Sequence, residues 1–113
     1  MSVTLYSKDE RNDISMSYST FDFLRTSIEV SYRFTKTPVT PEVESFFKQS
    51  DVEGEVGLLS CSDLWNHLQD KEWYDLNIGG DTPLYAERDF WWLDDFKKLI
   101  KYCVDTNQGF EWA

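Results

Sequence analysis

Two short segments near the start of the chain alternate between apolar and polar residues, and this alternation restricts the fold more than any other feature. Residues 2–7 and residues 14–19 each repeat with a period of two, which is typical of half-buried strands. The polar segment 8–13 is a short connector, so the two segments predict an antiparallel hairpin. One face of the hairpin would carry Val3, Leu5, Ile14, Met16 and Tyr18, and the other Thr4, Tyr6, Ser15, Ser17 and Ser19.

Helical spacing follows the second of these segments. Ser19 and Asp22 stand three positions apart, which is a capping-box pattern and predicts that a helix begins there. The segment 37–39 contains a proline and ends the helical pattern. The apolar face of this helix is predicted to carry Phe21, Leu24, Ile28 and Tyr32.

Three more helices are predicted further along the chain. One begins at Thr40-Pro41-Glu42, where a hydroxyl cap, a proline and an acid favour a helix start. Another is expected to be capped by Ser60 or Ser62, and the last runs roughly over residues 87–105. Residues 51–57 are predicted to form an acidic loop, and residues 78–83 a turn. The residues expected to be buried are Val43, Phe46 and Phe47, then Leu64, Trp65 and Leu68, then Phe96, Leu99, Ile100, Cys103 and Val104.

Together these patterns predict an α+β fold, in which three to four helices pack on one face of a small antiparallel sheet. The sheet consists of the N-terminal hairpin, and residues 110–112 can add a C-terminal strand at the edge of that hairpin. A length of 113 residues fits one domain that spans residues 1–113.

The chain is strongly acidic. It has 21 Asp and Glu against 11 Lys and Arg, a formal net charge of −10. Residues 36–95 hold fourteen of the acids and four of the bases, whereas the segments on either side are nearly neutral. Phosphate backbones and anionic membrane surfaces repel such a chain. We therefore expect neither nucleic acid nor a membrane as a direct partner, and we expect a basic protein surface, such as that of a nuclease or another nucleic-acid-binding protein.

The sequence also bears on the cellular compartment. No apolar run approaches the roughly 20 residues that a membrane-spanning helix needs. The first residues lack the basic region and apolar run of a signal peptide. Two cysteines do not make the disulfide framework of a small secreted domain. These features favour a cytoplasmic protein with reduced thiols.

Residues that commonly carry catalysis are scarce. The one histidine, His67, lies six positions after Cys61, which is about 240° around a helix, so the two would not share a face. The sequence has no paired-cysteine spacing and no histidine pair for zinc. Gly79-Gly80 is not followed by the Lys-Ser/Thr of a phosphate-binding loop. We expect a protein that is not an enzyme, with no catalytic residues, no metal and no cofactor.

Aromatic residues are interleaved with the acids in the middle of the chain. Aromatic rings among charged residues are typical of the anchors of protein interfaces. Residues 90–93 cover almost every face of a helical turn, so they cannot all enter one small core. The residues predicted to bind a partner are Glu53, Glu55, Trp73, Tyr74, Asp75, Asp81, Trp91 and Trp92.

Segments at both ends of the chain are similar to known sequences. The segments Leu5-Tyr6-Ser7-Lys8, 13–18 and 21–25, together with 95–97 and 103–105, make up its matching part. In these segments the chain resembles small uncharacterised acidic proteins of phages and their Firmicute hosts, many of which have glycines where this chain has Ser19-Thr20. The resemblance implies an accessory protein of a phage or mobile element, and it brings no functional residue with it.

Three functions follow as hypotheses. The first is a phage-type inhibitor that masks the basic, nucleic-acid-binding surface of a host defence protein, as anti-CRISPR proteins do. The second is an immunity protein that neutralises a nuclease toxin by the same electrostatics. In the third, the chain is an accessory or structural phage protein whose acidity serves only solubility.

Overall fold

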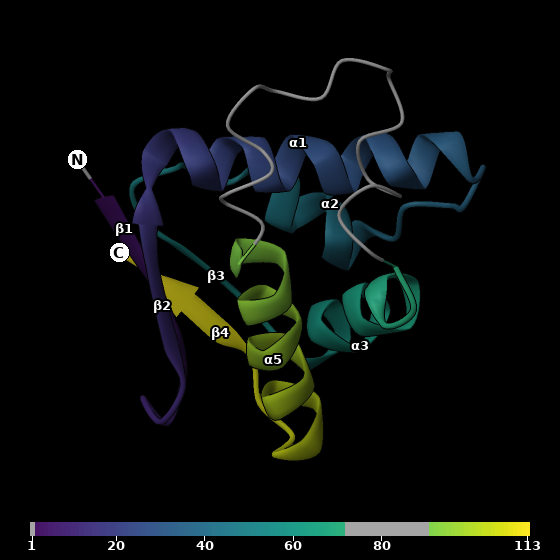
Figure 1. Ribbon diagram of the computed structural model, residues 1–113. Coiled ribbons are helices and arrows are strands. Elements are labelled where there is room, and N and C mark those ends of the chain that lie inside the picture. The colour runs from purple at the N-terminus through teal and green to yellow at the C-terminus, as the bar shows by residue number, and fades with distance from the viewer. Residues whose placement is uncertain (1, 72–90) are drawn as a thin grey trace.

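The computed structural model describes residues 2–71 and 91–113, and of Trp91 it describes only the place in its helix. Four strands and four helices lie in these ranges (Figure 1). The strands form one antiparallel sheet in the order β2-β1-β4-β3. This is the predicted α+β fold. In chain order the elements are β1 (Ser2–Ser7), β2 (Asp13–Ser17), α1 (Tyr18–Phe34), α2 (Pro41–Lys48), β3 (Gly54–Val56), α3 (Leu58–Leu68), α5 (Trp91–Asp105) and β4 (Phe110–Trp112).

The N-terminal hairpin forms as predicted, with β1 and β2 paired so that Leu5 lies opposite Ile14 and Val3 opposite Met16. All four of these side chains are buried, because the period of two places them on the same face of the sheet. Tyr18, which was predicted to extend the second strand, is instead the first residue of α1.

The C-terminal strand joins the hairpin edge, as predicted, and becomes an inner strand of the sheet. On one side β4 pairs with β1, and on the other side with β3. The prediction of a loop over residues 51–57 was wrong at its centre, because Gly54–Val56 is a strand. Its three residues pair only with the C-terminal strand, more than fifty positions away, so no local pattern indicates the strand.

The helices bury most of their predicted apolar faces, whereas Phe47, Trp65 and Val104 are only partly buried. Two of the predicted caps were wrong. In α1 the cap is Ser17, whose side chain accepts a hydrogen bond from the Thr20 backbone N–H, so the Ser19–Asp22 box is not used. In α3 the cap is Gly57, without a side-chain hydrogen bond, whereas Ser60 lies inside the helix. The predicted start of α2 is confirmed, since Thr40 accepts from the Val43 backbone N–H.

The helices cover one face of the sheet (Figure 1). A cluster of aromatic side chains lies between the two layers. Phe46 of α2 lies at its centre, with its ring centroid 5.6–6.1 Å from those of five other rings. Phe96 and Ile100 of α5 are fully buried, as predicted. The five rings around Phe46 are those of Phe21, Phe47, Phe96, Phe110 and Trp112.

Candidate partner-binding surface

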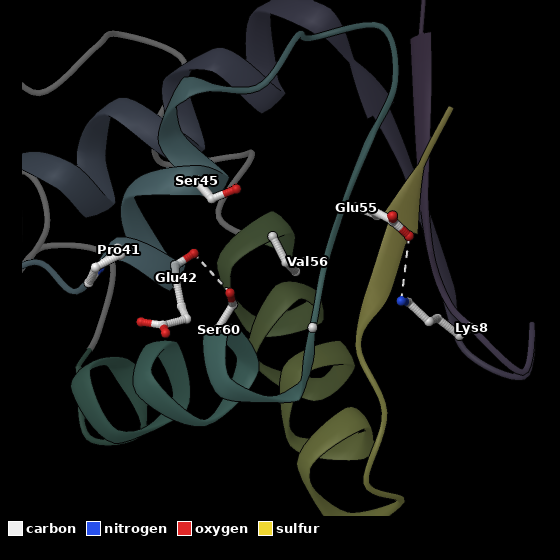
Figure 2. A pocket seen from close by; sticks show the side chains of 8 residues that line it. Lys8, Pro41, Glu42, Ser45, Glu55, Val56 and Ser60 are labelled. Carbon is white, nitrogen blue, oxygen red and sulfur yellow. Dashed lines mark hydrogen bonds and ion pairs between the residues drawn. The ribbon is translucent and has the colours of Figure 1, made fainter.

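A groove of about 400 Å³ opens between α2, β3 and the start of α3 (Figure 2). Glu42 and Ser45 project from α2 on one side, and Glu55 and Lys8 lie on the sheet side. The Ser60 hydroxyl donates to the Glu42 carbonyl oxygen over 2.8 Å, so this hydroxyl is already engaged. The remaining residues that line the groove are Pro41, Val56 and Gly57.

Glu55 connects this groove to the opposite face of the sheet. Its backbone belongs to the edge strand β3, and its carboxylate is 3.5 Å from the Lys8 ammonium group. Both side chains are well exposed, at 63% for Glu55 and 43% for Lys8. An exposed pair of this kind contributes only about 0–1 kcal/mol, because water and salt screen it. The Glu55 carboxylate therefore remains accessible to a competing cation.

The solvent-facing side of the sheet is polar. The inward positions of the four strands are buried apart from Gly54, and the outward positions are exposed or half-buried. The Thr4 and Ser15 hydroxyls share a hydrogen bond of 2.8 Å across β1 and β2. Glu111, at the centre of β4, faces Tyr6 on one side and Glu55 on the other. The solvent-facing side of the sheet is thus made of hydroxyls, one tyrosine ring and carboxylates.

The structure describes only some of the residues that were predicted to bind a partner. Glu53 and Glu55 are exposed, in the loop before β3 and in β3 itself. Trp92 is 4% exposed and packs edge-on against Phe23 with the ring centroids 5.8 Å apart, so in this conformation it belongs to the core. The α5 helix begins at Trp91. Trp73, Tyr74, Asp75 and Asp81 lie outside the described residues.

The outward strand residues Tyr6, Asp13 and Glu111 were not among those predicted to bind a partner. The alternation already placed Tyr6 on the polar face of the hairpin. The sequence does not give the register between β1 and β4, and it is this register that brings Glu111 beside Tyr6.

The buried His67 forms a hydrogen bond with Ser31, but the direction of this hydrogen bond is the opposite of the one that serine activation requires. His67 Nε2 lies 2.8 Å from the Ser31 hydroxyl oxygen, and that hydroxyl donates its proton to the Ile28 carbonyl over 2.7 Å. Nε2 must therefore carry a proton and donate to Ser31. A histidine that activates a serine has to accept the serine's proton instead.

Burial also removes His67 from acid–base chemistry near neutral pH. Burial first, and then the positive charge of the nearby Lys71, lower the pKa of His67 to about 4 against the opposing effect of Asp70. The imidazole is stacked on the Tyr32 ring with the centroids 3.8 Å apart. A second cavity, of about 390 Å³, is lined in part by these two side chains. Inside it the histidine is a neutral packing residue.

The two thiols are buried and are not joined in a disulfide. Cys61 on α3 and Cys103 on α5 are free and fully buried. Contact with Cys103 and then burial raise the pKa of Cys61, which keeps it protonated. The Cys103 thiol donates to the Gly109 carbonyl over 3.4 Å. Within residues 2–71 and 91–113, no group of three or more histidine, cysteine or acidic side chains is arranged to hold a metal ion.

None of the helices in the described ranges is long and apolar enough to cross a membrane. No family model, curated protein or solved structure matches the chain.

Proposed function

We propose that this chain is a non-enzymatic binding protein that masks the basic, nucleic-acid-binding surface of another protein. In this role its carboxylates act as a nucleic acid mimic, as those of acidic anti-CRISPR proteins do. The resemblance of its two ends to acidic phage proteins makes a host defence protein the preferred partner. The observation that carries the proposal is the excess of acidic over basic residues, 21 against 11. Among the described residues, many of the exposed carboxylates have no cationic side chain beside them.

The ion pairs of the described residues leave many carboxylates without a cation. Glu44 pairs with Lys48 at 2.7 Å and Asp105 with Lys101 at 2.8 Å, in both cases one helical turn away. Glu10, Asp22 and Glu53 are exposed and form no ion pair within the described ranges. A field of one sign steers an oppositely charged partner toward the surface and can speed association about 10–1000-fold.

If the acidity serves only solubility, the rate of association with a partner should not depend on salt. Partners captured from host lysate on the immobilised protein would first be identified and purified. Association rates would then be measured by stopped flow between 0.01 M and 0.1 M salt, where the screening length falls from about 30 Å to about 10 Å. We expect association to slow as salt rises. Association that is indifferent to salt would show that the charge does not steer binding, and the masking proposal would be abandoned.

A variant with fewer charges tests the same point from the protein side. Glu53→Gln, Glu55→Gln, Asp75→Asn and Asp81→Asn together remove four negative charges. We expect slower association and a flatter salt dependence, with a melting temperature close to that of the parent. The matched control removes four positive charges, Lys36→Gln, Lys48→Gln, Lys98→Gln and Lys101→Gln, and should associate at least as fast as the parent.

Masking has a direct functional readout. A captured nucleic-acid-binding partner should lose its ability to shift labelled DNA or RNA on a gel once this protein is added in excess. A partner that binds nucleic acid and this protein simultaneously, each without weakening the other, would contradict masking.

A further inference from the structure

One face of the sheet is covered by helices (Figure 1). The outward residues of the opposite face are exposed or half-buried. We call this second side the open face and define it by the outward strand residues. Its β2 end is lined by small hydroxyl side chains, which leave room for the backbone of a partner to approach. The residues of the open face are Ser2, Thr4, Tyr6, Asp13, Ser15, Ser17, Glu55 and Glu111.

Strand register aligns four of these residues in a row across the sheet. Asp13 lies opposite Tyr6, Tyr6 opposite Glu111, and Glu111 opposite Glu55. One residue comes from each strand, in the order β2, β1, β4 and β3. Neighbouring strands are about 4.8 Å apart, so the row spans about 14 Å. The tyrosine ring thus stands between carboxylates on both sides.

This arrangement is unfavourable for the isolated protein. Glu55 and Glu111 carry like charges directly opposite each other, and such cross-strand pairs destabilise a sheet. Lys8 offsets only part of this charge, through the exposed ion pair described above. Partial burial, and then the negative charges of Glu111 and Glu10, raise the pKa of Tyr6. The open face therefore holds a negative potential that a cation on a partner would relieve.

We propose that the open face is the docking surface for the basic partner and that it receives arginine side chains. This inference rests on the proposed function and adds where the partner binds and which chemistry it presents. A guanidinium group can stack on an aromatic ring while its N–H groups form paired hydrogen bonds with a carboxylate. The row offers that combination at Tyr6, with Asp13 and Glu111 beside it. A lysine ammonium group lacks the plane that stacks.

The rim of the open face is held in place before any partner arrives. The Asp9 carboxylate, in the turn between β1 and β2, accepts hydrogen bonds from the Ser7 hydroxyl at 2.7 Å and the Tyr102 hydroxyl at 2.6 Å. The Asp9 backbone N–H donates to the Gln108 side chain over 2.8 Å. These contacts fix the hairpin turn to the end of α5. A preorganised surface loses less entropy on binding.

The test uses nona-arginine and nona-lysine peptides as probes of the parent chain and two variants. Glu111→Gln with Asp13→Asn removes two charges from the row, and Asp22→Asn with Asp70→Asn removes two exposed charges from the helical side. Binding at low salt would be measured by calorimetry, and the contact site by amide chemical shifts. We expect nona-arginine to bind the parent more tightly than nona-lysine and to shift residues of β1, β2 and β4. The open-face variant should weaken nona-arginine binding at least about threefold more than the control variant does, since it loses two carboxylates that would pair with arginine.

A second measurement needs no partner. Glu111→Gln relieves the repulsion from Glu55, so it should raise the melting temperature by roughly 2–3 °C while it weakens peptide binding. Equal losses in the two double variants, equal affinity for the two peptides, or shifts confined to helices would overturn the open-face proposal and leave the masking function standing. A parent that binds neither peptide at low salt would overturn both.

Discussion

At the scale of single residues, the polar side chains inside the fold are held by specific partners. Arg25 of α1 is only 5% exposed. Its guanidinium group donates to the Phe46 carbonyl at 3.2 Å and to the Gln49 carbonyl at 2.7 Å, and it pairs with Asp51. It also lies 4.4 Å from the centre of the Phe21 ring. One side chain thus joins α1 to the end of α2 and to the loop before β3.

His67 should make folding stability depend on pH in mildly acidic solution. Its pKa is about 4 in the folded protein and about 6.5 when unfolded. The unfolded chain therefore binds a proton first, and stability falls as pH drops from 6.5 to 4, by on the order of 1–3 kcal/mol. His67→Gln should remove this part of the decline when urea unfolding is measured at pH 7, 5.5 and 4.5. The same slope in both proteins would show that other groups cause the decline.

At the scale of elements, β3 depends on side chains from outside the strand. The Gln49 side-chain amide accepts from the Glu55 backbone N–H at 3.0 Å and donates to the Glu55 carbonyl at 2.7 Å. It thereby occupies hydrogen-bonding groups that an edge strand otherwise presents to other chains. Gly54 lies directly against the Trp112 ring, where a Cβ atom would collide. A glycine that usually weakens a strand is thus required here by packing.

Gln49→Ala should therefore loosen this edge without unfolding the protein. Two hydrogen bonds to the Glu55 backbone and an exposed one to the Ser45 hydroxyl are lost, each with a net contribution of at most about 0.5–1.5 kcal/mol. We expect a loss of roughly 1–2 kcal/mol in the free energy of unfolding, and faster hydrogen exchange at the Glu55 amide. Gln69→Ala, at an exposed position after α3, is the control and should leave that amide protected. Unchanged exchange at Glu55 in Gln49→Ala would show that the side-chain amide does not hold the strand.

At the scale of the whole molecule, the sheet and helices share one aromatic core. Phe96 stacks on Phe46 with centroids 5.6 Å apart and meets Phe110 edge-on at 5.8 Å. These three rings belong to α5, α2 and β4, so the cluster links the two layers. The outward side of the sheet carries no part of this cluster; its residues are hydroxyls, carboxylates and the Tyr6 ring.

Phe96→Ala should cost about 3–5 kcal/mol, because it removes a fully buried ring and leaves a cavity. That is a large share of the 5–15 kcal/mol typical of whole domains. Lys98→Ala lies on the same helix with its side chain 77% exposed and should change stability by less than about 0.5 kcal/mol. The comparison is made by urea denaturation of both variants. Equal stabilities would mean that α5 does not support the core.

The sequence by itself determined the elements whose signal is local. The period of two predicted β1 and β2, helical spacing predicted the buried faces of α1 and α5, and Thr40-Pro41 predicted the start of α2. The buried positions in these segments follow because burial repeats with the geometry of the backbone.

Only the tertiary structure decided how distant segments meet. The strand β3 exists because β4 pairs with it, and Ser31 meets His67 because α1 packs near α3. Strand register brings Asp13, Tyr6, Glu111 and Glu55 into one row on the open face. Of these four residues, only Glu55 was predicted to bind a partner. Such contacts depend on which surfaces bury each other in three dimensions, and no short window of sequence carries that information.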